Sequence, residues 1–205
     1  MDIAREVARR LNRKPELITT AWDGIIAGLM AKKFDLIIGS MAITDERLKS
    51  VSFSDPYYIS GAQMVTRKGT TIADAADLKG KVVGVTVGET YAEYVQENIP
   101  GVKRVNSYKG GVPSLLLELR NKRIDAFVTD RLVGLAAIKQ AGGAGAVLAG
   151  DLLYTERIGI AVRKEDTTLL AQVNAALAAM KEDGTYTTIS SEWFGMDISG
   201  EESKE

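Results

Sequence analysis

Short apolar segments that alternate with amphipathic ones are the feature that most constrains the fold of this chain. Residues 2–12 carry apolar side chains at helical spacing, and Leu17–Thr20 is predicted to be a short β-branched strand. A second helix is expected over residues 25–30 and a second apolar strand over residues 35–39. Strands that alternate with helices predict a parallel α/β sheet, because each helix carries the chain back to the same end of the sheet.

The rest of the chain repeats this alternation. Residues 61–67 are predicted to form a strand, and residues 71–78 a helix that Gly80 ends. Three further strands are expected at 81–87, 102–108 and 124–128, with helices that begin near Thr90, Gly111 and Leu132. A strand at Arg157–Arg163 then precedes a long helix at 167–182 and a shorter one that carries Tyr186 to Phe194. We therefore predict an α/β protein with two small doubly wound units.

The residue types that the chain lacks narrow its chemistry. Its 205 residues include no cysteine and no histidine, which excludes disulfides, a Ser-His-Asp triad, a Cys-His pair and the usual histidine-based zinc sites. The formal net charge of −1 gives no electrostatic reason to expect nucleic acid or an anionic membrane surface. No apolar run approaches the ~18 residues of a membrane-spanning helix. We expect no metal, no cofactor and no catalytic residue.

The stretch Phe34–Tyr58, FDLIIGSMAITDERLKSVSFSDPYY, carries the densest set of functional signals. A buried strand runs into Gly39 and Ser40, where a ligand can approach the backbone. Thr44 is a good helix N-cap, and Arg47 follows three residues later on the same short turn. A fixed guanidinium beside free backbone N–H groups is suited to bind a carboxylate. The alternative is that Arg47 only pairs with Asp45 or Asp55 on the surface.

Three runs in the chain resemble one family. The pattern S-x-x-I-T-x-x-R is followed by F-S-x-x-Y, and G-T-Y-x-x-I-x-x-x-W-F stands near the end of the chain. These patterns resemble the polar amino acid-binding proteins of bacterial ABC importers, the type II periplasmic solute-binding fold of family 3. The resemblance implies that Arg47 holds the α-carboxylate of an amino acid and that the run Ser40, Met41 and Ala42 helps to hold its ends. Many relatives have Thr or Ser where this chain has Ala42, so one hydroxyl contact would be missing.

The resemblance also implies ligand contacts from the second lobe. Thr90, at the start of a helix, would share the carboxylate; Asp130, just past a strand, would pair with the α-ammonium group; and Trp22 would lie against the ligand side chain. Each residue has a simpler explanation. Thr90 and Asp130 are each good candidates for an N-cap, and Trp22 for ordinary core or interface packing. Glu89 and Glu156 stand near these positions with no role that a motif assigns.

The family also implies how the chain divides. Residues 1–66 and 163–205 would form lobe 1 and residues 67–162 lobe 2, with hinges near Val65–Lys68 and in the strand that ends at Arg163. Relatives begin with a further strand of lobe 1, so we expect this strand to be absent here. The exposed strand edges would then be repaired by association, for example as a homodimer through lobe 1 with weakened ligand binding.

The function implied by the resemblance is that of a solute-binding component of an amino-acid ABC importer. Its partners would be a free amino acid and a membrane permease, and it would work in the periplasm or outside the cell, lipid-anchored or soluble. No signal peptide is expected within this chain, since helix-like residues follow Met1 directly. One alternative is an enzyme that resembles cyclohexadienyl dehydratase, with Glu89 or Glu156 as the proton donor. Another is the ligand-binding domain of a receptor or sensor.

Overall fold

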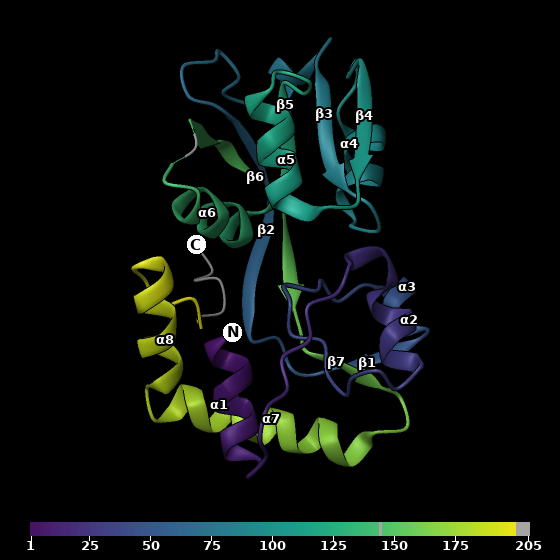
Figure 1. Ribbon diagram of the computed structural model, residues 1–205, viewed down its shortest axis with the longest axis vertical. Helices are drawn as coiled ribbons and strands as arrows, with labels where there is room; N and C mark the ends of the chain where they lie inside the picture. Colours follow the sequence, from purple (N-terminus) through teal and green to yellow (C-terminus); the bar gives the residue numbers. More distant parts are fainter. Residues whose placement is uncertain (144, 200–205) are drawn as a thin grey trace. The chain divides into compact units, whose positions relative to one another are not determined.

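The chain forms two compact units in a computed structural model, which describes residues 1–143 and 145–199 (Figure 1). Unit 1 comprises Met1–Thr20, Gly24–Ile59 and Glu156–Glu205, and unit 2 comprises Ala21–Asp23 and Ser60–Thr155. The chain changes unit inside two long strands, β2 (Tyr58–Arg67) and β6 (Ala146–Ile158). The lobe boundaries expected from the sequence, at 66/67 and 162/163, both lie later in the chain than the observed unit boundaries at 59/60 and 155/156. Residues 200–205 of the expected lobe 1 lie outside the described residues.

Unit 1 is mainly helical around a small sheet. Its helices are α1 (Asp2–Arg10), α2 (Ile25–Met30), α3 (Asp45–Leu48), α7 (Thr167–Glu182) and α8 (Thr185–Phe194). Its sheet is the antiparallel pair of β1 (Val51–Phe53) and β7 (Ala161–Arg163). Isolated bridges join Ile37 to Ala161 and Ala42 to Ile158. The core of unit 1 is apolar because the inward faces of α1, α2 and α7 supply fully buried side chains, among them Val7, Leu29, Val173 and Met180.

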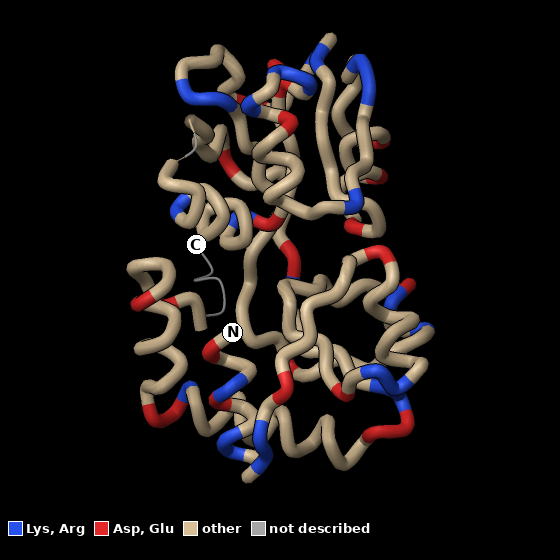
Figure 2. Tube along the Cα trace, viewed as in Figure 1, with Lys and Arg blue, Asp and Glu red and all other residues tan. Residues whose placement is uncertain are grey.

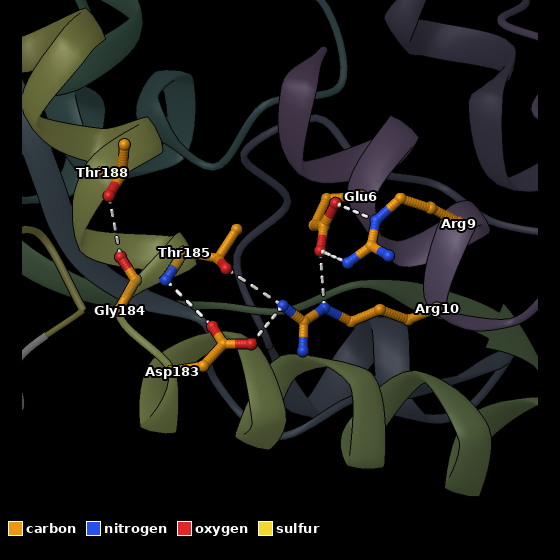
Figure 3. A network of polar contacts seen from close by, with 7 residues as sticks. All are labelled: Glu6, Arg9, Arg10, Asp183, Gly184, Thr185 and Thr188. Atoms are coloured by element: carbon orange, nitrogen blue, oxygen red, sulfur yellow. Dashed lines mark hydrogen bonds and ion pairs between the residues drawn. The ribbon is translucent and has the colours of Figure 1, made fainter.

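A polar network joins α1 to the turn between α7 and α8 (Figure 3). The guanidinium of Arg10 donates to Asp183 Oδ2 at 2.7 Å and to Thr185 Oγ1 at 3.1 Å, and its Nε donates to Glu6 at 2.7 Å. Glu6 also accepts from Arg9 at 2.6 Å. Basic and acidic residues both lie along α1, and the ion pairs of Arg9 and Arg10 with Glu6 and Asp183 balance the charges of the network locally (Figure 2). Hydrogen bonds to these donors hold the pKa of Asp183 at about 2, with Thr185 as the largest cause and Arg10 next.

The buried Arg163 ties the loop after α2 to the end of β7. Its guanidinium donates to the carbonyl oxygens of Leu29 at 3.2 Å and Phe34 at 2.8 Å, and to the carboxylate of Asp35 at 2.9 Å. Its Nε lies 2.7 Å from the carboxylate of Asp166. A buried guanidinium needs such partners, because a buried charge without them is costly. The chain segment that leads to Ser40 is therefore fixed at its start.

Unit 2 is a five-stranded sheet in the order β4-β3-β5-β2-β6. The strands β3 (Val82–Thr86), β4 (Arg104–Tyr108) and β5 (Ala126–Asp130) run parallel, and β2 lies antiparallel to β5. Between the strands lie the short helix η2 and the helices α4, α5 and α6, at Ala75–Leu78, Tyr91–Asn98, Gly111–Arg120 and Arg131–Gln140.

The two faces of this sheet bury two separate apolar clusters. Successive residues of a strand point to opposite faces. Accordingly, Ala126 and Val128 pack in the cluster that α4 covers, whereas Phe127 packs in the cluster that α5 and α6 cover. Fully buried neighbours on β2, Met64 and Val65, divide between the faces in the same way. The sheet is thus covered by helices on both sides, as a doubly wound fold requires.

Several predicted elements are wrong in position or extent. Leu17–Thr20 forms no strand, and all its residues are exposed. Residues 14–20 make no main-chain hydrogen bond within the described part of the chain. A β-branched composition favours a strand only where a neighbouring strand is present to pair and pack with it. The expected strand at 35–39 is reduced to the bridge at Ile37. The helix expected at 71–78 is only the four-residue η2. The strand expected at Arg157–Arg163 is divided between β6 and β7, and most of β6 was missed because polar residues interrupt its pattern.

Candidate functional site

The loops that leave the carboxyl ends of β3 and β5 carry two of the predicted residues. Thr86 of β3 lies beside Tyr108 of β4, and Gly84 lies beside Phe127 of β5, so the parallel strands end at the same edge of the sheet. The chain after β3 passes through Gly88 to Thr90, and β5 ends with Asp130. Ligands of open α/β sheets bind at this edge, so the topology places both residues where such chemistry is found.

Trp22 lies against the loop after β3. Its indole Nε1 donates to Gly88 O at 3.1 Å. Gly88 has a φ of +82°, which an L side chain rarely adopts, and a Cβ there would lie 3.5 Å from Trp22 Cδ1 and 3.4 Å from Asp23 Cα. Lys109, just after β4, forms an ion pair with Asp23 at 3.2 Å. The half-buried Trp22 is therefore held against Gly88, which stands two residues before Thr90 in the chain.

Thr90 does not cap the helix that it precedes. As the N-cap residue of α4 it makes no side-chain capping bond, and its Oγ1 instead lies 3.0 Å from the hydroxyl oxygen of Tyr154 on β6. The N-cap explanation for its hydroxyl is thus wrong. Tyr154 was not predicted from the sequence, because it stands 64 residues from Thr90 in a strand that the apolar pattern did not indicate.

Asp130 does cap its helix. Its Oδ1 accepts from the backbone N–H groups of Leu132 and Val133, both at 2.9 Å, at the start of α6. The residue is 3% exposed, so its carboxylate lies among protein atoms rather than in water. A capping role for Asp130 is therefore present, and the contact with an α-ammonium group stays a prediction.

Arg47 is held beside Ala42 by short-range contacts. Its Nη1 donates to Ala42 O at 2.9 Å. Its backbone N–H donates to Thr44 Oγ1 at 3.2 Å, which confirms Thr44 as the N-cap of α3. These contacts span five residues of sequence or fewer, and the contact from Nη1 holds the guanidinium at the run that the sequence indicated.

The run Ser40 to Ala42 is buried or half-buried backbone rather than a row of exposed side chains. The side chain of Met41 is 1% exposed, and its carbonyl accepts from Gly159 N at 3.1 Å, so Met41 can serve a ligand only through its backbone. Ser40 has a φ of +56°, which is uncommon for a residue other than glycine. The hydroxyl of Tyr58 donates to Ser40 Oγ at 2.5 Å. Tyr58 is a further residue that the sequence patterns did not assign to the site.

The predicted residues therefore fall into two groups. Ser40, Met41, Ala42 and Arg47 lie together in unit 1. Trp22 and Thr90 belong to unit 2, where Trp22 contacts the loop that leads to Thr90, and unit 2 also holds Asp130. Among the described residues, no group of three or more His, Cys, Asp and Glu side chains is arranged to hold a metal ion. No described helix combines the length and the apolar character that crossing a membrane demands.

Comparison with known proteins gives consistent matches over nearly the whole chain. Residues 1–196 match the bacterial extracellular solute-binding proteins, family 3. The chain is 40% identical over 200 residues to the L-cystine-binding protein TcyJ of Escherichia coli, a match that covers 97% of this chain and 74% of the relative. It is 37% identical over 199 residues to ABC transporter arginine-binding protein 1 of Escherichia coli, covering 95% of this chain and 80% of that protein.

Solved structures agree with these sequence matches. An ancestral arginine-binding protein bound to glutamine has a TM-score of 0.87 at 42% identity, over 95% of this chain and 86% of the other. A substrate-binding protein of an ABC uptake transporter from Streptococcus pneumoniae with bound histidine has a TM-score of 0.88 at 31% identity, over 98% of this chain and 84% of the other. These similarities confirm the predicted α/β fold of type II solute-binding proteins.

Proposed function

The chain belongs to family 3 of the bacterial extracellular solute-binding proteins, and from that membership we propose that it binds an α-amino acid for an ABC importer. Relatives are named as binding proteins for L-cystine, arginine and histidine. Solved neighbours are described with bound glutamine, arginine and histidine. All of these ligands share an α-carboxylate and an α-ammonium group, so recognition of that shared part is the common requirement.

The observation that carries this proposal is the guanidinium of Arg47, which Ala42 O holds on the short helix that Thr44 caps. The guanidinium of arginine carries its N–H groups in one rigid plane, which suits a carboxylate. Thr90 would add a hydroxyl, Asp130 would accept from the ammonium group, and Trp22 would contact the side chain of the ligand. Backbone groups of Ser40, Met41 and Ala42 would complete the contacts to the ligand's polar end.

The proposed ligand contacts come from residues of both units. Binding would therefore involve a hinge motion of β2 and β6, the strands in which the chain passes from one unit to the other. The ligand-bound form would then dock on a membrane permease. The relatives include periplasmic proteins, and we propose the same compartment, or the outside of the cell, for the mature protein, either lipid-anchored or soluble.

A purely binding role is preferred over catalysis. The relatives are named as solute-binding proteins, and a dehydratase would need a carboxylic acid kept protonated beside its substrate. Glu89 and Glu156 are the candidates for such an acid. Incubation with prephenate or arogenate tests this alternative, because the appearance of product would establish an enzyme.

A thermal-shift screen of the twenty amino acids, ornithine and opines tests the proposed function directly. A ligand that binds only the folded protein stabilises it by about 2.7 kcal/mol when present at 100 times its Kd. We expect at least one α-amino acid to raise the melting temperature, and its decarboxylated amine to leave it unchanged. If no amino acid produces a shift at millimolar concentration, the proposal is wrong.

A further inference from the structure

Tyr154 is held in unit 2 both by its ring and by its backbone. Its ring packs against Tyr94 of α4 with centroids 4.3 Å apart and lies 6.3 Å from the ring of Tyr91. Its backbone is held as closely, because a Cβ on Gly61 of the neighbouring strand β2 would lie only 2.1 Å from Tyr154 O. Only glycine at position 61 permits that approach. Strand and helix together therefore fix where the phenol hydroxyl points.

That hydroxyl meets the hydroxyl of Thr90. The two oxygens are 3.0 Å apart, within hydrogen-bond distance. Thr90 lies immediately before α4, yet its side chain makes no capping bond to the helix. Threonine in this position usually caps. The contact with Tyr154 therefore replaces the ordinary local use of the threonine hydroxyl, and it sets the rotamer of Thr90 from a strand 64 residues away in sequence.

The direction of this hydrogen bond follows from what Thr90 would bind. A carboxylate can only accept hydrogen bonds, so a threonine hydroxyl that contacts it must donate its single proton to it. Thr90 Oγ1 must then accept from its other hydroxyl neighbour, and the phenol of Tyr154 is placed to donate. A chain of this kind, phenol to threonine to carboxylate, polarises each hydroxyl in the same sense and strengthens the final bond.

We propose that Tyr154 is a positioning residue for the ligand site, which orients the Thr90 hydroxyl so that it donates to the carboxylate of a bound amino acid. The inference rests on the proposed function, since it needs an amino acid with its carboxylate at Thr90. Tyr154 acts through Thr90. It raises the affinity for the amino acid because the Thr90 hydroxyl is already oriented to donate before the ligand binds.

Titration calorimetry of Tyr154→Phe with L-arginine, and in parallel with L-cystine, L-histidine and L-glutamine, tests the proposal. Phenylalanine keeps the ring packing and removes only the hydroxyl. We expect the Kd of the bound amino acid to rise about 3- to 10-fold, the usual effect of losing one hydrogen bond. Thr90→Val should weaken binding at least as much, and the double variant should bind no worse than Thr90→Val alone, because both changes remove the same chain of hydrogen bonds.

Tyr94→Phe is the matched control. Its hydroxyl donates to Leu153 O at 2.9 Å in the same aromatic cluster. We expect this variant to lose a similar amount of stability and to keep wild-type affinity within twofold. An unchanged Kd in Tyr154→Phe, an equal loss in Tyr94→Phe, or fully additive losses in the double variant would each overturn the inference and leave the proposed function standing. Failure of the wild-type protein to bind any amino acid of the full thermal-shift screen would overturn both.

Discussion

Two of the side chains that carry the proposed function, Arg47 and Asp130, are held by contacts within a few residues of sequence. Arg47 is the clearest case, since Ala42 O and Thr44 Oγ1 hold its side chain and its backbone from within five residues of sequence. A guanidinium held in this way loses little further conformational entropy when a ligand binds. The effect of removing it should therefore appear in affinity rather than in folding.

We expect Arg47→Ala to weaken amino-acid binding by about 2–5 kcal/mol, the range for truncating one partner of a desolvated charge pair. The free energy of unfolding should fall by no more than about 1 kcal/mol, because Arg47 is only half-buried. Calorimetric titration and urea unfolding measure the two effects. Lys49→Ala, two residues further along the chain at the end of α3, is the control, since Lys49 is exposed and its one ion pair among the described residues is with Glu46. Wild-type affinity in Arg47→Ala would remove this residue from the site.

Asp130 also caps α6, so a loss of affinity in a variant could come from the helix rather than from the ligand contact. A comparison of two ligand series separates the two causes. We expect Asp130→Asn to weaken binding of α-amino acids more than binding of the matching α-hydroxy acids, because only the amino acids carry an ammonium group. The amide oxygen of asparagine can still accept the capping bonds from Leu132 and Val133. Competition titrations with both ligand series give the ratio. Equal weakening of the two series would assign the effect to the helix cap alone.

At the scale of elements, the helices of unit 1 were easier to predict than its strands, whereas β3, β4 and β5 of unit 2 lie within two residues of their predicted bounds. The helices α1, α7 and α8 lie close to their predicted bounds, because helical hydrogen bonds and apolar spacing are both local. Strand pairing depends on distant segments, so Leu17–Thr20 has the composition of a strand and no partner. The residues of the candidate site show the same difference between local and distant contacts. The contacts of Arg47 follow from a local motif, whereas Tyr58 and Tyr154 reach Ser40 and Thr90 from 18 and 64 residues away.

The network between α1 and the turn before α8 predicts an acid-dependent contribution to stability. Asp183 has a folded-state pKa of about 2, below the ordinary value of 3.8. A lowered pKa means that its contribution is fully present above pH 3.8 and is lost as the pH falls through about 2. We expect the difference in unfolding free energy between wild type and Asp183→Asn to be constant near neutral pH and to shrink between pH 4 and pH 2.

Glu182→Gln serves as the control for this pH dependence. Glu182 is exposed and neighbours Asp183, but it forms no ion pair in the part of the chain that the structure describes. Urea unfolding of the three proteins across the acid range gives the comparison. A difference for Asp183→Asn that stays constant down to pH 2 would show that Arg10 and Thr185 stabilise the ionised carboxylate no better than water does.

At the scale of the whole molecule, one segment of unit 1, residues 14–20, bears on whether the protein associates with itself. Residues 14–20 are exposed and make no main-chain hydrogen bond among the described residues, and they include the apolar Leu17 and Ile18, which are 40% and 50% exposed. The sheet of unit 1 has only two named strands in the described chain. An extended segment with open N–H and C=O groups is a template for pairing with another chain. A second copy of the same segment offers the same groups, so a two-fold antiparallel pairing is self-complementary.

We therefore expect these 205 residues to form dimers through residues 14–20 as concentration rises, with amino-acid affinity weaker in the dimer than in the monomer. A charge in the paired segment opposes such association, so Ile18→Lys should shift the equilibrium toward monomer. Leu117→Lys is the control, since Leu117 is 45% exposed on α5 of unit 2 and should leave association unchanged. Light scattering across a concentration series measures the molecular mass of each protein. A wild-type monomer at all concentrations, or a dimer that Ile18→Lys leaves intact, would show that this segment does not pair.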